Sequence, residues 1–95
     1  MILVRIVFQA HHGKIDQLVA SFKQATHDAP ERPIILTDLS GPMDTMVMVT
    51  RHASLAAYEQ WRAELFKSQR FQEGQAQNDG LIESGSVEFY TIEQE

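Results

Sequence analysis

The segment ILVRIVFQ, residues 2–9, is the stretch of this sequence that decides the fold. It is rich in β-branched and aromatic side chains, which suit the pleated surface of a strand. Side chains alternate along a strand, so the segment presents two faces. The face expected to meet helices carries Ile2, Val4, Ile6 and Phe8, and the other carries Leu3, Arg5, Val7, Gln9 and His11. Leu3 and Val7 make the second face partly apolar as well, which predicts a sheet with apolar side chains on both faces.

A helix is expected directly after this strand, beginning near Gly13. The apolar side chains then recur with a period of 3.6 residues, the pattern of an amphipathic helix. This stripe consists of Ile15, Leu18, Val19, Phe22, Ala25 and Thr26. Pro30 and Pro33 mark the end of the helix, because proline disfavours helical geometry in the residue before it.

The middle of the chain predicts a hairpin and a second helix. Strands are expected at 33–40 and 44–51, and the short gap between them around Gly41 and Pro42 favours a hairpin. Ser54 is a good N-cap for a helix whose stripe consists of Leu55, Tyr58, Trp61, Arg62, Leu65 and Phe66. We expect a break near 67–68, then a looser polar stretch, QEGQAQNDG at 72–80, and a last strand at 84–93.

The order of elements is therefore βαββαβ in a single domain spanning residues 1–95. It predicts an α+β, ferredoxin-like fold, a four-stranded antiparallel sheet with two helices on one face, because right-handed crossovers place both helices on the same side. Nothing then covers the second face. Its expected patch, or the equivalent set if the alternation is reversed, is Leu3, Val7, Ile35, Leu39, Met46 and Met48.

Such a patch predicts a partner, because soluble monomers rarely expose a contiguous apolar area above a few hundred Å². We expect a closed homodimer in which sheet packs on sheet. The alternative is that the chain's own C-terminal tail folds across part of the face.

Composition excludes several classes of function. The chain has no cysteine, so disulfides, thiol nucleophiles and zinc ribbons are excluded. The formal charge of −5 is spread along the chain, whereas nucleic-acid binding needs a concentrated basic face. The first segment is too short to span a bilayer and lacks a signal-peptide cleavage site. We therefore expect a soluble, cytoplasmic protein with no nucleic acid or membrane among its partners.

Three segments carry a resemblance to a known superfamily. They are the opening strand with Gly13, Lys14 and Ile15, the helical YEQWRAELFKSQRFQE at 58–73, and the closing GSVEFYTIE at 85–93. Over nearly its whole length the chain resembles the dimeric α/β-barrel superfamily, particularly the small antibiotic-biosynthesis-monooxygenase-like and NIPSNAP-like domains. The resemblance implies two protomers that pack their sheets into one barrel. Haem-degrading relatives combine an Asn near strand one with a Trp and a helix-two His. Here Trp61 matches, but strand one has no Asn and no His follows Trp61, so no haem or other cofactor is expected.

Arg5 and His11 are the candidate catalytic residues. Arg5 lies in the middle of the first strand, where an unpaired charge is costly to bury. Glu88 across the last strand could pair with it, or Arg5 could bind a carboxylate or enolate between the sheets. His11 and His12 adjoin at a turn, and no metal-ligand spacing such as HxH or HExxH occurs. They are either surface residues or, for His11, a group that stabilises negative charge.

The candidate ligand-binding residues are aromatic or soft. Tyr58 and Trp61 are either core residues of the second helix or the walls of a pocket for a flat organic molecule. Tyr90 and Met48 are further candidates, since methionine suits an adaptable cavity. The sequence thus predicts binding of a small hydrophobic or aromatic ligand, with a cofactor-independent monooxygenase or isomerase as the alternative. It leaves open whether the pocket lies between two sheets or between sheet and helices.

Overall fold

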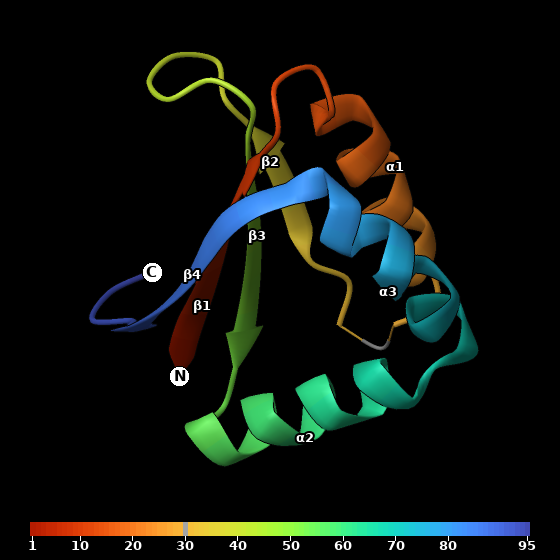
Figure 1. Ribbon diagram of the computed structural model, residues 1–95. Helices are drawn as coiled ribbons and strands as arrows, with labels where there is room; N and C mark the ends of the chain where they lie inside the picture. Colours follow the sequence, from red (N-terminus) through yellow and green to blue (C-terminus); the bar gives the residue numbers. More distant parts are fainter. Residues whose placement is uncertain (30) are drawn as a thin grey trace.

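The computed structural model describes residues 1–29 and 31–95, with the side chains of 70, 76 and 77 also left aside. Pro30, one of the residues expected to end the first helix, lies outside the described residues. The elements are β1 (Ile2–Ala10), α1 (Ile15–Ala25), β2 (Ile34–Thr37), β3 (Thr45–His52), α2 (Leu55–Lys67), α3 (Gln69–Leu81) and β4 (Ile82–Thr91) (Figure 1). The strands form one antiparallel sheet in the order β2-β3-β1-β4, which confirms the predicted ferredoxin-like arrangement.

β1 is a central strand of the sheet and pairs along its length with β3 on one side and β4 on the other. Arg5 therefore stands opposite Val49 in one pair and Glu88 in the other. Val4, in the middle of the strand, is fully buried. A strand paired on both edges has its backbone hydrogen bonds satisfied, so its apolar side chains are free to serve packing on both faces.

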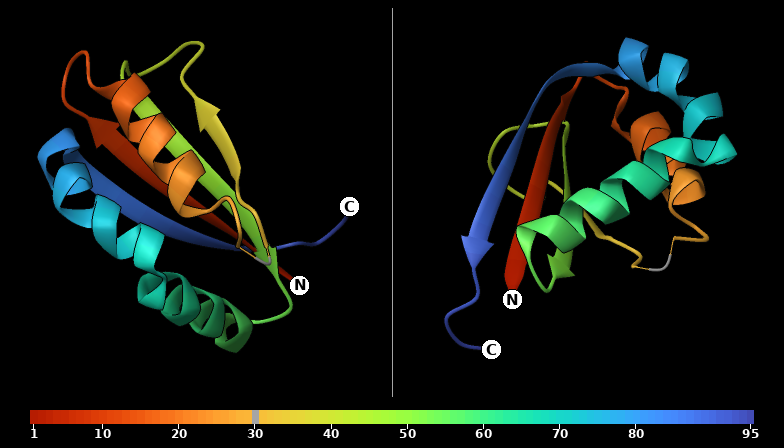
Figure 2. Two further views of the ribbon diagram at one scale, coloured as in Figure 1. Left: turned by 90° about the vertical axis from the view of Figure 1, so that its right-hand side faces the viewer. Right: turned by 90° about the horizontal axis from the view of Figure 1, so that it is seen from below.

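The helices pack on one face of the sheet, as Figure 2 shows from two directions. Two clusters of buried side chains fill the space beneath them. One cluster contains Leu18 and Phe22 of α1 together with Met46 and Met48 of β3. The other joins Val4 to the α2 residues, which are Tyr58, Trp61 and Leu65. The predicted covered set of β1 is thus confirmed, because Val4 belongs to one cluster and Ile6 and Phe8 pack against them.

The second helical region differs from the prediction. The break near 67–68 is present, and Ser68 makes it: its extended backbone ends α2, and its hydroxyl accepts a hydrogen bond from Phe71 N (3.2 Å) to cap α3. However, residues 69–81 are a regular helix, so the expectation of a loose polar stretch at 72–80 was wrong. Phe71, Asn78 and Leu81 lie on the inner side of α3 at helical spacing, and tertiary packing outweighs the poor helix propensity of the two glycines.

The hairpin is confirmed, with a shorter first strand and a longer loop than expected. β2 covers only four residues, and residues 38–44 connect it to β3. Asp38 holds the loop closed, because its Oδ1 accepts a hydrogen bond from Thr45 N at 3.0 Å. Asp44 completes the turn with φ of 59°, a left-handed conformation that Asp tolerates better than most residues.

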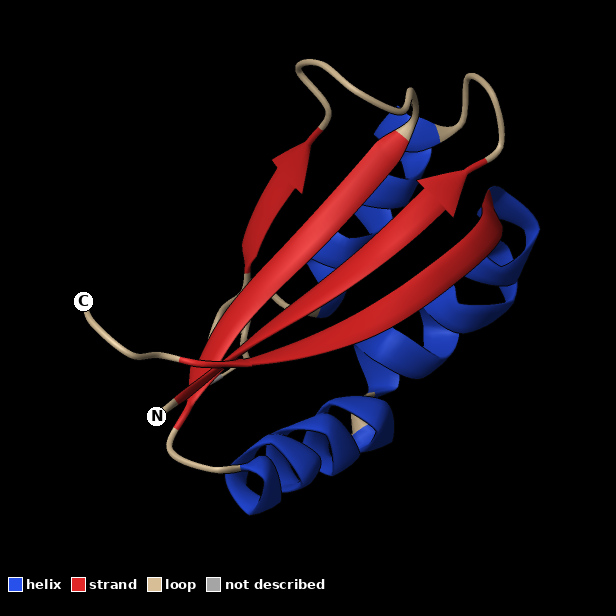
Figure 3. Cartoon of the chain, turned by 90° about the vertical axis from the view of Figure 1, so that its left-hand side faces the viewer, coloured by secondary structure: helices blue, strands red, loops and turns tan. Residues whose placement is uncertain are grey.

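The second face of the sheet carries none of the described helices (Figure 3). Three residues of the predicted patch, Ile35, Met46 and Met48, belong instead to the covered face, because β3 has the opposite alternation. Leu39 lies in the loop that follows β2. The apolar side chains of what we call the open face are Leu3, Val7, Ile34, Leu36, Val47 and Val49. Ile34 and Leu36 are 58% and 48% exposed.

The C-terminal tail stays near one end of this face. Ile92 N–H donates to the carbonyl of Met1 at 3.2 Å, and Arg51 pairs with Glu95 at 3.1 Å. Figure 3 shows the C-terminal tail running away from the sheet at the end where the N-terminus lies, whereas Val7 pairs with Val47 farther along β1. The tail therefore does not replace a partner across the apolar centre.

Gly85 offers a test of this packing. A Cβ at Gly85 would lie 3.2 Å from the Phe8 ring and 3.3 Å from the carbonyl of Val7. We expect Gly85→Ala to lower the free energy of unfolding by about 1 to 3 kcal/mol, because β4 must shift from Phe8. In Gly80→Ala, where a Cβ meets nothing within 4 Å, we expect a gain of about 1 kcal/mol from helix propensity. Urea unfolding measures both, and equal stability of the two variants would contradict this packing.

Candidate functional site

A cavity of about 460 Å³ lies between the helical layer and the strands β1 and β4. This volume is within the usual range for small-molecule sites, about 300 to 1,000 Å³. Its lining is mostly apolar and aromatic, with a few polar groups. The lining residues are Ile6, Phe8, Phe22, Met48, Tyr58, Trp61, Arg62, Leu65, Phe66, Phe71, Gln75, Asn78, Asp79, Ile82, Gly85, Ser86 and Val87.

Helix α2 supplies an aromatic wall of this cavity. It begins at Ser54, whose hydroxyl accepts a hydrogen bond from Ala57 N at 3.2 Å. The rings of Tyr58 and Trp61 stack with centroids 6.1 Å apart. The indole Nε1–H of Trp61 donates to the carbonyl of Glu31 at 3.1 Å, which fixes the plane of the ring. These two candidates are therefore both buried packing residues and cavity walls.

The rim of the cavity combines aromatic rings with a positive charge. Phe66 and Phe71, from the two sides of the helix break, stack at 4.7 Å. The guanidinium of Arg62 lies 4.2 Å from the centre of the Phe66 ring, a cation–π contact. Across from them, Val87 of β4 is 48% exposed. Apolar surface thus continues from the interior to an accessible edge.

Tyr58 is the phenol of this wall. Burial raises the pKa of Tyr58 above its ordinary value, and the positive charge of Arg62 opposes this shift in part. The hydroxyl is consequently protonated at neutral pH and is available as a hydrogen-bond donor.

His52 lies behind the aromatic wall. It is the last residue of β3 and is only 6% exposed, although the strand predicted at 44–51 ended one residue before it. Its Nε2 lies 2.8 Å from Thr50 Oγ1, and its ring centroid lies 5.4 Å from those of Tyr58 and Trp61. Burial lowers the pKa of His52, while the negative charge of Glu31 acts in the opposite direction. At neutral pH His52 is therefore uncharged and packs against the rings of Tyr58 and Trp61.

Arg5 and Tyr90 occupy the opposite side of the sheet. Arg5 Nη1 donates to both carboxylate oxygens of Glu88, at 2.8 and 2.7 Å, which confirms the predicted cross-strand ion pair. The hydroxyl of Tyr90 donates to Glu88 Oε1 at 2.6 Å. The hydrogen bonds from Tyr90 and then Arg5 lower the pKa of Glu88, and the same contact with Glu88 raises the pKa of Tyr90. This network stands on the open face.

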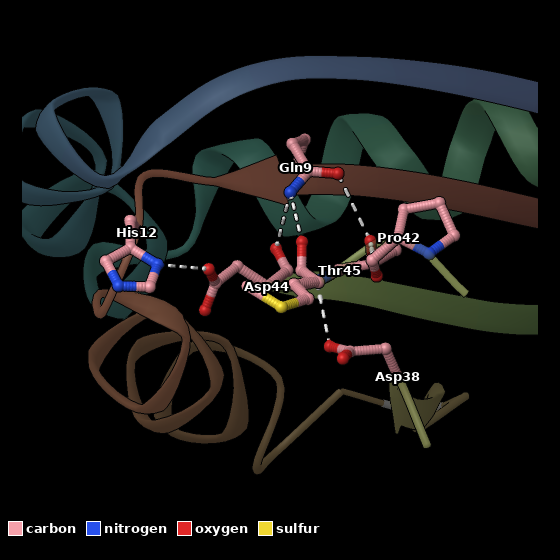
Figure 4. Close-up of polar contacts among 7 residues, drawn as sticks. Gln9, His12, Asp38, Pro42, Asp44 and Thr45 are labelled. Atoms are coloured by element: carbon pink, nitrogen blue, oxygen red, sulfur yellow. Dashed lines mark hydrogen bonds and ion pairs between the residues drawn. The ribbon is translucent and has the colours of Figure 1, made fainter. Parts of the chain in front are cut away.

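The two histidines at the end of β1 belong to a third location. His11 is exposed, and its backbone N–H donates to the carbonyl of Leu81 at 3.0 Å. His12 Nδ1 lies 3.3 Å from Asp44 Oδ2 at the hairpin loop (Figure 4). Gln9 binds the same loop through Asp44 O at 3.4 Å and accepts from Thr45 Oγ1 at 3.2 Å. These contacts secure the loop, and His11 is not among the residues that line the cavity.

The structure therefore brings three of the six candidates together. Tyr58, Trp61 and Met48 line one cavity, whereas Arg5 and Tyr90 share the open face and His11 lies at the end of the sheet. The α3 residues of the cavity, including Asn78, were missed because residues 72–80 read as a loose polar segment. The available signal was the helical spacing of Phe71, Asn78 and Leu81.

Two absences concern the described part of the chain only. No group of three or more His, Asp and Glu side chains is arranged there to hold a metal ion. Among the described helices, none combines the length and the apolar character that crossing a bilayer requires.

Comparison with known proteins gives matches among solved structures alone. No family model matches the chain, and no curated protein does. An uncharacterised NIPSNAP domain protein from Burkholderia xenovorans superposes with a TM-score of 0.81 at 15% identity, covering 97% of this chain and 94% of its own. A NIPSNAP family protein from Agrobacterium tumefaciens superposes with a TM-score of 0.84 at 19% identity, covering 96% of this chain and 84% of its own. A protein from Nitrosomonas europaea, provisionally named an antibiotic biosynthesis monooxygenase, superposes with a TM-score of 0.75 at 11% identity, covering 99% of this chain and 100% of its own.

These superpositions confirm the predicted resemblance at the level of the fold. The chain has the ferredoxin-like α+β fold of the NIPSNAP and antibiotic-biosynthesis-monooxygenase-like structures over almost its entire length. Identities of 11% to 19% carry the fold and not an activity.

The environment of His52 predicts a specific pH dependence. Its lowered pKa means that the unfolded chain takes up a proton at His52 more readily than the folded protein does, so this residue reduces stability as the pH falls below the ordinary value of 6.5. We expect the His52 ring to titrate below 6.5 by NMR. We also expect His52→Phe to lose less stability than the wild type between about pH 7.5 and about pH 5.5. A midpoint at or above 6.5 would contradict the burial of the charged form.

Proposed function

We propose that this protein binds a small, flat, hydrophobic organic molecule in the cavity between sheet and helices. The observation that carries the proposal is the cavity of about 460 Å³ bounded by the stacked rings of Tyr58 and Trp61. Aromatic faces suit a flat apolar molecule, because offset stacking adds to the gain from burying its area. The rim charge of Arg62 offers one polar contact to the exposed end of such a ligand.

This location is favoured over a pocket formed at the open face. The cavity is concave within one protomer and keeps its aromatic wall fixed through the Trp61–Glu31 hydrogen bond. On the open face, Arg5 already donates to Glu88, and Tyr90 shares the same carboxylate. A ligand that recruited Arg5 would first have to displace this partner, so Arg5 is better placed as a structural cation than as a ligand contact.

The chain carries a built-in reporter for this binding. It contains a single tryptophan, so the indole N–H of Trp61 gives one resonance in a spectrum of ¹⁵N-labelled protein. We expect titration with 2-methylnaphthalene to shift this resonance saturably, because the ring would stack on the cavity wall. In Val87→Phe, where a larger side chain fills the accessible edge, we expect the affinity to fall at least about tenfold, or about 1.4 kcal/mol.

A matched control separates filling of the cavity from a general effect of an added ring. Leu39→Phe places the same side chain in the fully exposed hairpin loop, where we expect the affinity to remain that of the wild type. An indole resonance that does not move at any attainable concentration of the probe would refute the proposal.

The alternative function, a cofactor-independent monooxygenase or isomerase, has one specific observation in its favour. Tyr58 is a protonated phenol in the cavity wall, and a positioned donor of this kind stabilises an oxyanion that forms on a bound substrate. Binding alone leaves the ligand chemically unchanged, whereas oxygenation consumes dissolved oxygen together with the substrate. Oxygen uptake during incubation with phenolic ligands, compared between wild type and Tyr58→Phe, separates these two functions.

The open face supports the second part of the proposal, a homodimer in which two sheets pack face to face. Six apolar side chains from three strands are gathered there, and Val47 lies at their centre opposite Val7. A two-fold axis would place the same patch on both sides of the interface, so the surface has only to be complementary to itself. Each protomer would keep its own cavity, because the helices lie on the outer side of such a dimer.

The dimer is tested by light scattering after gel filtration. We expect the wild type to elute with about twice the chain mass of 10.8 kDa. In Val47→Lys a charge would be buried in the centre of the interface, so we expect a folded monomer. Leu55→Lys, which changes an exposed leucine on α2, serves as the control and should stay dimeric. A wild type that is monomeric at micromolar concentration would overturn this assembly.

A further inference from the structure

Asn78 of α3 is a buried polar residue whose side-chain oxygen has no hydrogen-bond partner in the described structure. Its side chain is 5% exposed, and its Oδ1 accepts no hydrogen bond. A buried acceptor without a donor costs roughly 1 to 3 kcal/mol, so natural proteins rarely leave one. Asn78 is also one of the residues that line the cavity. The side chain with this unpaired oxygen therefore belongs to the lining of the site proposed to bind a ligand, although the oxygen itself is buried.

Local structure gives no reason for an asparagine at this position. The backbone carbonyl of Asn78 accepts from Ile82 N and completes the end of α3, a role that any residue could fill. Asparagine is a poor residue for a helix interior, and a leucine or alanine there would favour the helix more. Neither the secondary structure nor the packing therefore explains the amide.

A glycine one turn before Asn78 lets α3 lie close to α1. A Cβ on Gly74, one turn before Asn78, would lie 3.2 Å from Ser21 Oγ of α1 and 3.9 Å from Asn78 Nδ2. The amide nitrogen is thus the branch on the Gly74 side. The oxygen is the other branch of the same planar group, and rotation about the Cβ–Cγ bond, which has broad minima, can turn it toward a ligand.

The chemistry of the lining defines what could satisfy this oxygen. The cavity lining includes donors on Tyr58, Arg62, Gln75 and Ser86, but none of them bonds to Asn78 Oδ1. Most other lining residues are apolar and offer no donor, among them Phe8, Phe22, Phe71 and Ile82. We infer that Asn78 is a specificity-determining residue whose amide oxygen accepts a hydrogen bond from a hydroxyl or N–H group on the inner end of the ligand. The ligand class is then a flat hydrophobic alcohol, phenol or amine rather than a hydrocarbon. This inference rests on the proposed binding function.

The test compares two probes of nearly the same shape, 2-naphthol and 2-methylnaphthalene, which differ by a hydroxyl in place of a methyl group. Both are titrated against wild type and Asn78→Leu, and the Trp61 indole resonance follows binding. We expect the affinity ratio of 2-naphthol to 2-methylnaphthalene to fall about tenfold in Asn78→Leu, about 1.4 kcal/mol of lost discrimination. Gln24→Leu, which removes an exposed amide on α1, should leave the ratio unchanged.

Each outcome separates this inference from the function on which it rests. Binding of both probes with the same ratio in wild type and Asn78→Leu would overturn the role of Asn78 and leave the binding function intact. Failure of both probes to bind the wild type would remove the binding function and this role with it. Asn78→Leu should unfold at no lower urea concentration than the wild type, because it removes an unpaired polar group. If it does not fold, Asn78→Ala removes the same amide without added volume and gives the same comparison.

Discussion

The structure depends on the position of β1 in the interior of the sheet. Both of its edges are occupied, by β3 and by β4, so its side chains have only two directions in which to be buried. Along one direction Val4 and its neighbours meet α1, α2 and α3. Along the other, Leu3 and Val7 have no helix from the described chain above them. β1 carries apolar side chains on both faces, and the described helices cover only one of them.

This division assigns different work to the two faces. The covered face holds the cavity, which Trp61 lines together with residues from both sides of the helix break at Ser68. The open face carries the Arg5 and Glu88 pair among apolar residues. Because a sheet is one residue thick, groups on its two faces cannot act on one bound molecule. A function that used Arg5 together with Trp61 is therefore incompatible with this fold.

The parts of the fold that the sequence predicts are those in which burial and polarity alternate strongly. β1 and α1 are of this kind. The pairing of Arg5 with Glu88 was predicted from the expected neighbourhood of the first and last strands together with the opposite charges of the two residues. The parts that it does not predict are those in which tertiary packing overrides local preference. Residues 69–81 form a helix although Gly74 and Gly80 weaken it, and His52 is buried by aromatic rings that arrive from α2. The sequence predicts a pocket but not its place, because the position of the cavity depends on the angle between helices and sheet.

The ion pair between Arg5 and Glu88 has a consequence that exceeds its energy. Their side chains are 41% and 33% exposed, so solvent screens the attraction and the pair adds little to stability. A shift of β4 by two residues would keep every side chain on its own face. In one direction it would pair Arg5 with Ser86 and Glu88 with Leu3, and in the other it would pair Arg5 with Tyr90 and Glu88 with Val7. The hydrophobic pattern cannot distinguish these alignments. The two charges can distinguish them, so the ion pair selects one register between the first and the last strand.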